Sequence, residues 1–513
     1  MVNLPSSFVS VAQMKEIEKK TFIESGISET VIIENVGLRA FDFFHELVIH
    51  DKIDFKQEQD WAIVLLGKGN NSADGLAMAR HLHNKSYQVM VIPLMGLQKI
   101  SQELKKQLDY AKMVEVPFGT IDELEKFLAN QSNVIIDAVW GTGFTPPISD
   151  KMAKVFSQIN RATNLVISLD IPSGICGENG KVDKFALTAD YTLAVSILKT
   201  AHLFGEGAKS VGEVVIVDGG FPRKFLEVPG QHLLEIETIA HHLPLRSDWF
   251  HKNNYGHLLV IGGSEGMAGS ICLAAKSALC AGCGLATAAT WDENFAELYA
   301  RMYPEIMLKR VSQMDDLSKY DAILIGPGLG ISKQSRELVL KILSNFAGAV
   351  ILDADAINVL KLSTDQKNIK MRKGLTIFTP HVGEFAHLSS IAKLEVKNNP
   401  LPLAIERARQ LKAVIVLKDA HTIIAYPSGE VFVNNVRNEA LSTAGSGDIL
   451  AGIMASFVAQ KAATGAPDLE MAAAVGVKIH SQMGALATTQ FNPAAICASE
   501  LINFIGDAID ECS

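Results

Sequence analysis

Short apolar runs alternate with amphipathic segments along most of the chain. In the first half, helical stretches such as 76–84 and 121–129 separate these runs, which span residues 61–67, 88–93, 133–141, 164–170, 191–196 and 213–218. Continuous apolar strands that alternate with helices are typical of a parallel sheet covered on both faces. Ahead of them, apolar residues recur at helical spacing between positions 9 and 48, which predicts two amphipathic helices.

The alternation stops near residue 221 and later resumes. The intervening stretch mixes proline, histidine and polar residues without periodicity, which predicts a domain 1–225, a linker 226–245 and a domain 246–513. The later apolar runs span residues 257–263, 285–290, 322–328, 349–355, 375–380, 413–419 and 421–427. A Pro-Ser-Gly turn then leads into 430–434, which predicts antiparallel strands at the end of the sheet. We therefore expect an α/β fold with two αβα-layered domains, the first a Rossmann-like parallel sheet.

Composition narrows the class of protein. Hydrophobic residues make up 48% of the 513 positions, as in a globular chain with ample core. The formal net charge of -9 argues against a general nucleic-acid binder, because phosphate binding needs clustered Lys and Arg. The most apolar region, 258–290, is interrupted by Glu265, Lys276 and glycines, so we expect a buried strand–helix–strand and no membrane partner.

Cysteine usage and the N-terminus indicate a location. Six cysteines are too few for a disulfide scaffold, which favours a reducing compartment. The first twenty residues lack the basic-then-apolar order of a secretory signal, so we expect a cytoplasmic protein. Cys280 and Cys283 form one CxxC, for which packing is favoured over a redox or zinc role.

Polar residues follow three strands of the first predicted sheet. Asn70, Asn71 and Asp74 come after the first strand, Asp137 ends the third, and Asp170 ends the fourth. Ligands bind at the carboxyl ends of strands in open parallel sheets, and oxygen ligands of this kind suit a hard monovalent or divalent cation. Asn and Asp are also turn formers and helix caps. Their presence at three strand ends together favours a ligand site.

The run TAGSGDILAGIMASF at 443–457 is the strongest single motif. Gly445 and Gly447 free backbone N–H groups to face an anion at the start of an apolar helix. Asp448 beside such an anion site can accept a proton from a substrate hydroxyl during phosphoryl transfer. A capped helix after a flexible loop explains the acid but not the surrounding glycines.

The runs GNNSADGLAMAR, IIDAVWGTG and SLDIPSG resemble the NAD(P)H-hydrate epimerase family over about residues 10–220. The resemblance implies a potassium ion bound by Asn71, Asp137 and Ser173, and a proton-transfer role for Asp170. Ser72 and Ala73 replace a Gly-Gly pair of the family pattern. The hydrated dinucleotide would contact Asn70, Asn71, Ser72, Ala73, Asp74, Gly141, Thr142, Gly143, Phe144, Thr145, Pro146, Pro147 and Asp170.

The GxGD turn resembles the ribokinase-like kinases. Together with GGSEGMAGS, GPGLG, TPHVGEFAHL, AVILDADAIN and VIVLKDAHTII, it resembles the nucleotide-dependent NAD(P)H-hydrate dehydratases over about residues 245–505. By that resemblance the hydrated cofactor would contact Ala268, Gly328, His381 and Asp448. The adenine nucleotide would contact Lys418, Asp419, Ala420, His421, Thr422 and Gly447. Arg437 and Glu439 depart from the family's Gly-Asn-Pro-like run.

The two resemblances together imply a bifunctional repair enzyme, an isomerase and a lyase. The first domain would interconvert the R and S hydrates of NADH and NADPH. The second would use Asp448 and Mg²⁺ with ADP or ATP to dehydrate the S-hydrate; fused bacterial members resemble ADP users, so ADP is the expected donor. We also expect a homo-oligomer. Two alternatives stay open: a small-molecule kinase in the second domain, and a ligand-sensing or scaffold role for the first.

Overall fold

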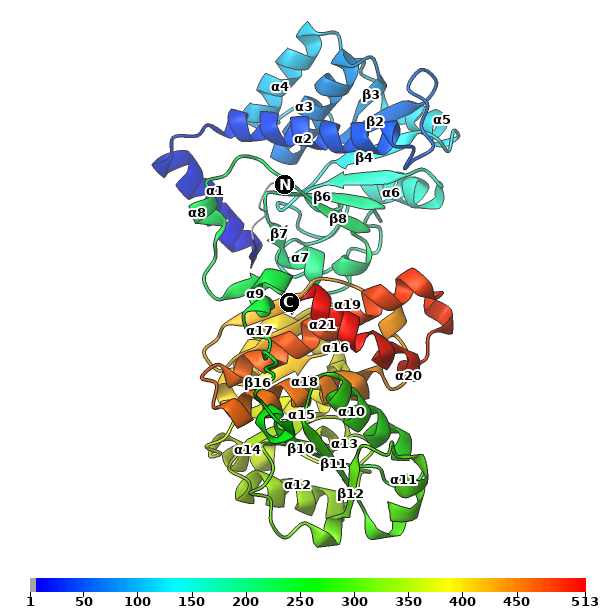
Figure 1. Cartoon of the computed structure of the whole chain (residues 1–513). Helices are drawn as coiled ribbons and strands as arrows, with labels where there is room; N and C mark the ends of the chain where they lie inside the picture. Colours follow the sequence, from blue (N-terminus) through cyan, green and yellow to red (C-terminus); the bar gives the residue numbers. More distant parts are fainter. Residues whose placement is uncertain (1–5) are drawn as a thin grey trace. The chain divides into compact units, whose positions relative to one another are not determined.

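The chain folds into two compact units. The computed structural model describes residues 6–513, so the first five residues of the predicted N-terminal domain lie outside the described residues. One unit ends at Gln231 and also includes Lys397–Asn399, and the other starts at His232. Figure 1 follows the chain through both units by colour.

A six-stranded sheet forms the centre of the first unit, in the order β3-β2-β4-β5-β6-β8. All of its neighbours pair in parallel, as predicted. The strands are β2 (Trp61–Leu66), β3 (Gln88–Pro93), β4 (Val134–Ala138), β5 (Val166–Leu169), β6 (Tyr191–Val195) and β8 (Glu213–Val217). Two short strands, β1 (Phe8–Val9) and β7 (Leu198–Lys199), pair separately and were not predicted, because two residues leave no periodic pattern.

Helices cover both faces of this sheet. Val64 and Ile136 pack into a cluster with residues of α2 and α3, whereas their neighbours Ile63 and Ile135 pack into a cluster with α6. Such alternation is the pattern expected of strands buried on both faces. The helices are α1 (Val11–Glu24), α2 (Glu29–Ile49), α3 (Asn70–Asn84), α4 (Gln102–Met113), α5 (Leu124–Leu128), α6 (Asp150–Arg161), α7 (Thr200–Leu203) and α8 (Arg223–Leu226).

A ten-stranded sheet forms the centre of the second unit, in the order β12-β11-β10-β13-β14-β15-β16-β17-β18-β9. Pairing is parallel from β12 to β16 and antiparallel at β17 and β18, which confirms the predicted antiparallel addition. The strands are β9 (Gln231–Leu233), β10 (His257–Ile261), β11 (Leu285–Thr290), β12 (Met307–Arg310), β13 (Ala322–Ile325), β14 (Ala349–Leu352), β15 (Thr376–Phe378), β16 (Val414–Leu417), β17 (Thr422–Ala425) and β18 (Val431–Asn434).

Part of the predicted linker 226–245 belongs to the second sheet. Strand β9 lies at the sheet edge beside β18, and the Leu234 amide donates to the Val433 carbonyl at 2.8 Å. Leu234 and Ile239 are fully buried. Within the predicted linker, residues 231–240 therefore form a short strand and a short helix, an apolar stretch that the surrounding Pro, His and Glu residues obscured.

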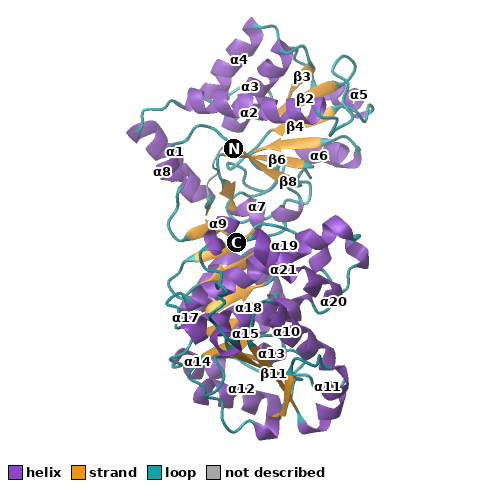
Figure 2. Cartoon of the chain, in the orientation of Figure 1, coloured by secondary structure: helices purple, strands orange, loops and turns teal. Residues whose placement is uncertain are grey.

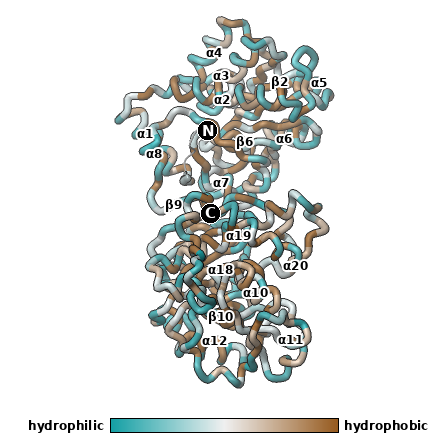
Figure 3. The backbone as a smooth tube through the Cα atoms, viewed as in Figure 1, coloured by the Kyte–Doolittle hydropathy of each residue, from teal (hydrophilic) through white to brown (hydrophobic). Residues whose placement is uncertain are grey.

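Alanine-rich helices pack closely on one face of the second sheet. Helices α10, α18 and α19 share one hydrophobic cluster with strand residues such as Val260 and Leu324 (Figure 2). Figure 3 shows that the interior of each unit is mainly hydrophobic. The helices are α9 (Ile236–Ala240), α10 (Ala268–Cys280), α11 (Phe295–Arg301), α12 (Lys333–Asn345), α13 (Asp355–Asn358), α14 (Leu362–Lys370), α15 (Val382–Ser389), α16 (Lys393–Asn398), α17 (Pro400–Leu411), α18 (Ser446–Thr464), α19 (Ala472–Gln490), α20 (Ala498–Leu501) and α21 (Ile505–Glu511).

The second cysteine of the CxxC pair packs in the protein interior, whereas Cys280 is exposed. Cys283 is buried, its thiol contacts the Leu285 carbonyl at 3.2 Å, and burial raises the pKa of this thiol to about 11. A thiol with so high a pKa is a poor nucleophile and metal ligand at neutral pH. Within residues 6–513, no group of three or more His, Cys, Asp or Glu side chains is arranged to hold a metal ion. No helix in the same range is long and apolar enough to cross a membrane.

Contact between α10 and α18 requires a glycine at position 452. A β-carbon there would lie 2.1 Å from the Ala274 carbonyl oxygen and 2.2 Å from the Ser277 hydroxyl. We expect Gly452→Ala to lower the free energy of unfolding of this unit by about 2 kcal/mol, because overpacked helices must separate. Denaturant unfolding followed by circular dichroism measures the loss.

Gly506→Ala is the matched control, since no atom lies within 4 Å of its β-carbon position in α21. Alanine is the better helix former, so this control should be neutral or slightly stabilising. Equal stability of Gly452→Ala and wild type would contradict the close packing of α10 on α18.

Candidate functional site

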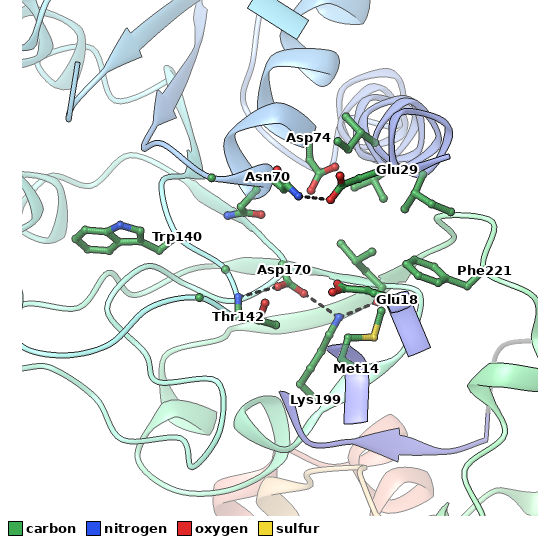
Figure 4. A pocket seen from close by; sticks show the side chains of 18 of the residues that line it. Met14, Glu18, Glu29, Asn70, Asp74, Trp140, Thr142, Asp170, Lys199 and Phe221 are labelled. Atoms are coloured by element: carbon green, nitrogen blue, oxygen red, sulfur yellow. Dashed lines mark hydrogen bonds and ion pairs between the residues drawn. The ribbon is translucent and has the colours of Figure 1, made fainter. Parts of the chain in front are cut away.

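A pocket opens where the strand order of the first sheet reverses. The chain adds β3 on one side of β2 and then crosses over to place β4 on the other. The loops that follow β2 and β4 therefore diverge, which leaves a crevice at the carboxyl edge of the sheet. The pocket there has a volume of about 460 Å³ and is lined by these loops together with residues of α1, α2 and α3 (Figure 4).

Asp170 lies in this pocket directly after β5. Its backbone has a φ of +62°, an uncommon conformation for a residue other than glycine. One carboxylate oxygen is 2.8 Å from the Lys199 ammonium, and the other accepts from the Thr142 amide at 3.2 Å. Burial alone would raise the pKa of Asp170, but Lys199 lowers it below its ordinary value. Asp170 is therefore an ionised carboxylate at neutral pH.

His202 holds Asp170 and Lys199 in place. The Lys199 amide donates to His202 Nδ1 at 3.0 Å, so the ring proton is on Nε2, which donates to the Asp170 carbonyl at 2.7 Å. Burial, reinforced by Lys199, lowers the pKa of His202 to about 4. The imidazole is thus neutral, and its two hydrogen bonds tie the backbone of β7 to that of Asp170.

Residues 70–74, which were expected to form a loop after β2, belong to a helix. Helix α3 begins at Asn70, not near residue 76, and Asn70, Asn71 and Asp74 line the pocket from its first turns. Asn70 donates to the Glu29 carboxylate. The buried side chain of Asn71 has neither its oxygen nor its nitrogen hydrogen-bonded within the described protein.

Ser72 and Ala73, which replace a Gly-Gly pair, point away from the pocket. Ala73 is fully buried. The Ser72 hydroxyl donates to the Ala138 carbonyl at 2.7 Å and accepts from the Gly67 amide at 2.8 Å. The serine thus links the loop after β2 to the end of β4, so the departure from the family pattern adds a brace and leaves the pocket wall unchanged.

The 141–147 segment divides into two parts. Gly141, Thr142 and Gly143 line the pocket. Phe144 instead packs on Trp140, with ring centroids 4.9 Å apart. The remaining predicted contacts are exposed and do not line the pocket: Thr145, Pro146 and Pro147.

Two of the three predicted potassium ligands, Asp137 and Ser173, are in direct contact. Asp137 is fully buried and accepts from the Ser173 hydroxyl at 2.6 Å, the Ser173 amide at 2.8 Å and the Ser168 hydroxyl at 3.0 Å. Burial raises the pKa of Asp137. Asp137 and Ser173 are thus in direct contact, and oxygen atoms such as theirs and the unpaired one of Asn71 are of the kind that a hard monovalent cation takes.

Sequence analysis missed several pocket residues. Glu18 and Met14 reach the pocket from α1, Lys199 from β7, and Phe221 from the segment after β8. The usable signal was the second face of α1, where Met14, Glu18 and Phe22 recur every four residues. Nothing local marks Lys199, because a tertiary contact alone brings it to Asp170.

The second unit has its own reversal of strand order, between β10 and β13. Ala268 begins α10 after β10, and Gly328 lies after β13. The Ser264 amide donates to the Gly328 carbonyl at 2.6 Å, which joins the two loops. These two predicted cofactor contacts therefore both lie at the carboxyl edge of the sheet, beside its strand-order reversal.

Asp448 sits in the first turn of α18, which starts after Gly445 in the left-handed conformation. Burial raises the pKa of Asp448 to about 6, and the neighbouring Asp353 adds to this rise. The Lys418 ammonium is 2.8 Å from Asp353 and 3.6 Å from the β-carbon position of Gly447. A cation and a helix N-terminus thus converge beside a carboxylate that titrates near neutrality.

His381 caps helix α15. Its Nδ1 accepts from the amides of Gly383 at 2.9 Å and Glu384 at 3.1 Å, and Glu384 in turn accepts from the His381 amide at 2.8 Å. The His381 side chain therefore has a structural role, because it caps the start of α15. The exposed imidazole leaves a substrate role for His381 as a prediction.

A cavity of about 630 Å³ collects most of the predicted nucleotide contacts, namely Lys418, Asp419, Ala420, Thr422 and Gly447. His421 is buried and does not line this cavity. Arg437 and Glu439, the departures from the family pattern, do line it, and so do His480 and Ser481 of α19, which sequence analysis missed.

Comparison with known proteins gives the family. A family model described as NAD(P)H-hydrate dehydratase matches residues 258–506, and one described as YjeF-related protein N-terminus matches residues 29–201. A bifunctional NAD(P)H-hydrate repair enzyme from Moorella thermoacetica is 31% identical, over 97% of this chain and 95% of its own length. The chain belongs to the family of bifunctional NAD(P)H-hydrate repair enzymes.

Two further comparisons indicate the same family. The repair enzyme of Escherichia coli is 27% identical, over 86% of this chain and 83% of its own length. A solved ADP/ATP-dependent NAD(P)H-hydrate dehydratase from Bacillus subtilis, co-crystallised with ATP and Mg²⁺, is 28% identical with a TM-score of 0.50, over 55% of this chain and 98% of its own. The predicted family, the two αβα-layered domains and the ribokinase-like fold of the second are confirmed.

Gly141 tests the geometry of the first pocket. A β-carbon at this position would lie 2.7 Å from an Asp170 carboxylate oxygen and 3.4 Å from the Asn71 amide carbon. We expect Gly141→Ala to displace that carboxylate and to slow hydrate epimerisation about 100-fold, with dehydration unchanged. Chromatographic separation of the two hydrates measures the rate. Gly143→Ala, which has open space at its β-carbon, should lose far less; equal losses in the two variants would contradict the stated geometry.

Proposed function

We propose that the chain repairs hydrated NADH and NADPH at two sites, one in each unit. The first site interconverts the R and S hydrates, and the second dehydrates the S-hydrate with a nucleotide as phosphoryl donor. The observation that carries this proposal is an aspartate beside the strand-order reversal of each sheet: Asp170 is buried, and Asp448 is half-buried and hydrogen-bonded to Ser270 near the start of α10.

Epimerisation inverts the hydroxyl-bearing carbon of the hydrated ring. A bond at that carbon must break and reform, and a proton must move in each step. The ionised Asp170 carboxylate is the base for this transfer, since Lys199 stabilises its charge and Thr142 orients it. The pocket-lining side of α3 and the segment from Gly141 to Gly143 hold the dinucleotide; the contacts from α3 are Asn70, Asn71 and Asp74.

Potassium is the proposed ion of the first site, held by Asn71, Asp137 and Ser173. The unpaired Asn71 oxygen and the buried Asp137 carboxylate support this assignment. Bound there, the ion supplies positive charge near the substrate oxygens. It would also satisfy the buried Asn71 amide oxygen, whose isolation would otherwise cost about 1–3 kcal/mol.

Dehydration begins with Asp448. Its carboxylate accepts the proton of the ring hydroxyl, and the hydroxyl oxygen attacks the terminal phosphorus of the nucleotide. Lys418 and the N-terminus of α18 stabilise the transferred phosphoryl group. The phosphate ester leaves far more readily than hydroxide, so elimination restores the nicotinamide ring.

The donor is ADP or ATP, with Mg²⁺ bound mainly to its phosphates, and ADP is the expected one. The 630 Å³ cavity beside Gly447 holds the nucleotide, and Ala268, Gly328 and His381 contact the hydrated cofactor. Arg437 and Glu439 line the nucleotide cavity, so they bear on donor preference. All six cysteines are free, in keeping with a cytoplasmic location, and the homo-oligomer stays a prediction.

The pH dependence of dehydration tests Asp448. A base works only when deprotonated, and its raised pKa is about 6. We therefore expect kcat/KM to fall about tenfold per pH unit below pH 6 and to level off above it. Recovery of absorbance at 340 nm from the S-hydrate with nucleotide and Mg²⁺ measures this. Asp448→Asn should lose about 100-fold or more at every pH. A stable phosphorylated product without recovered NADH would instead indicate a small-molecule kinase.

Potassium dependence tests the first site. Replacing K⁺ with tetramethylammonium at constant ionic strength should slow epimerisation about tenfold, because the Asn71 amide and the pocket lose their cation. Added K⁺ should also raise the unfolding temperature of the wild type, since it binds only the folded state. Asn71→Ala should abolish that rise. A K⁺ response that persists in Asn71→Ala would contradict the assigned ligand, and binding of the hydrates without epimerisation would favour a sensing role.

A further inference from the structure

A carboxyl group from α1 lies in the wall of the first pocket. Met14, Glu18 and Phe22 recur every four residues on one face of this helix, and all three line the pocket. The adjacent face, with Ile17 and Thr21, is buried in the protein core. A helix that needed only to cover the pocket would carry an apolar residue between Met14 and Phe22, so the half-buried Glu18 has no packing reason to be there.

Charged groups from five elements of the structure, α1 included, face Glu18. Asp170 and Lys199 lie at the ends of β5 and β7, Glu29 is on α2, Asp74 is on α3, and Lys15 is the neighbour on α1 itself. The Lys199 ammonium is already engaged by Asp170 at 2.8 Å and by the Val195 carbonyl at 2.7 Å. Glu18 therefore meets mainly other carboxylates. Burial, followed by the charge of Asp170, raises the pKa of Glu18 to about 7.

Glu18 and Asp170 are thus two neighbouring carboxyl groups in opposite states. Figure 4 shows Glu18 beside Asp170 and Lys199, whereas Asp74 lies across the pocket with Asn70 and Glu29. The ion pair with Lys199 keeps Asp170 charged, and that charge in turn favours a proton on Glu18. Neighbouring groups whose pKa values are driven apart are suited to act as acid and base.

We propose that Glu18 is the proton donor of hydrate epimerisation and that it acts together with Asp170 as acceptor. This inference rests on the proposed epimerase function of the first unit and adds a second reacting group to it.

Epimerisation by these two groups conserves every proton and electron pair. The Glu18 carboxylic acid protonates the ring hydroxyl, the C–O bond breaks with its electron pair leaving on water, and the ring-nitrogen lone pair forms a C=N bond. Water then adds to the opposite face of that carbon, and the C=N pair returns to nitrogen. Asp170 accepts the proton released by the adding water, and a proton passes back from Asp170 to Glu18, so no oxidant or second substrate is consumed.

The test compares epimerisation rates of the full chain for wild type, Glu18→Gln, Glu18→Asp and Glu16→Gln between pH 5.5 and 8.5. Glu16 is exposed and lies two residues before Glu18 on α1. The Glu16→Gln substitution therefore removes the same charge without changing the pocket. Purified R-hydrate is the substrate, nucleotide is omitted, and the spontaneous rate is subtracted. Dehydration of S-hydrate with nucleotide, run separately, shows that the protein is intact.

An acid with a pKa near 7 is lost as pH rises, so the wild-type rate should fall above pH 7. Glu18→Gln should lose about 100-fold or more and lack this pH dependence. Glu18→Asp should retain part of the rate and the same fall with pH, and Glu16→Gln should match wild type. A structural role for Glu18 would lower the rate without removing the pH dependence, which would overturn the proposal.

Two other results also overturn it. One is an epimerisation rate of Glu18→Gln within about twofold of wild type. The other is loss of the fall above pH 7 in Asp74→Asn but not in Glu18→Gln. Failure of the wild type itself to accelerate epimerisation would refute the proposed function of the first unit, which is a separate outcome.

Discussion

Both sites depend on the reversal of strand order in a parallel sheet. Where successive crossovers leave in opposite directions, their loops diverge at the carboxyl edge and leave a crevice that no side chain of the sheet fills. The reversal falls between β2 and β4 in the first unit and between β10 and β13 in the second. Each crevice lies beside a helix N-terminus, that of α3 or α10, and the surrounding loops supply its polar groups.

The same residue type has opposite electrostatics in the two crevices. Asp170 is paired with the buried Lys199, so its pKa falls despite burial. Burial raises the pKa of Asp448 to about 6 and the nearby Asp353 adds to the rise, while the Lys418 ammonium is paired with Asp353. The first arrangement keeps a carboxylate charged throughout the neutral range. The second makes a base able to take and release a proton near neutrality.

Much of the fold could be predicted, because strands buried on both faces leave uninterrupted apolar runs and GxGD marks the start of α18. The short strands β9 and β12 escaped prediction, since three or four residues leave too little pattern and pairing at the sheet edge alone defines them. The strand and helix within the predicted linker left no pattern for the same reason. Helix α3 begins at Asn70, ahead of the predicted start, and Ser72 in its first turn donates to the Ala138 carbonyl.

Candidate site residues could be chosen from the sequence at strand ends, as with Asp170 and Asp137, and at the glycine-rich start of α18, as with Asp448. The direction of a side chain could not be predicted from the sequence. Ser72, Ala73 and Phe144 belong to segments that line the pocket, yet their side chains point into the core. Glu18 and Lys199 lie far from any motif, and only tertiary packing brings α1 and β7 to the pocket. His480 and Ser481 reach the nucleotide cavity in the same way, from a helix with no marked polar pattern.

The most direct measurement follows the R and S hydrates of NADH separately by chromatography, with the wild-type chain, K⁺ and Mg²⁺, before and after addition of ADP or ATP. Two linked sites predict that the R and S pools equilibrate faster than the spontaneous rate without nucleotide. Both pools should then convert completely to NADH once nucleotide is present. Disappearance of the S-hydrate alone, with the R-hydrate following only at the spontaneous rate, would contradict an epimerase in the first unit; loss of neither would contradict both sites.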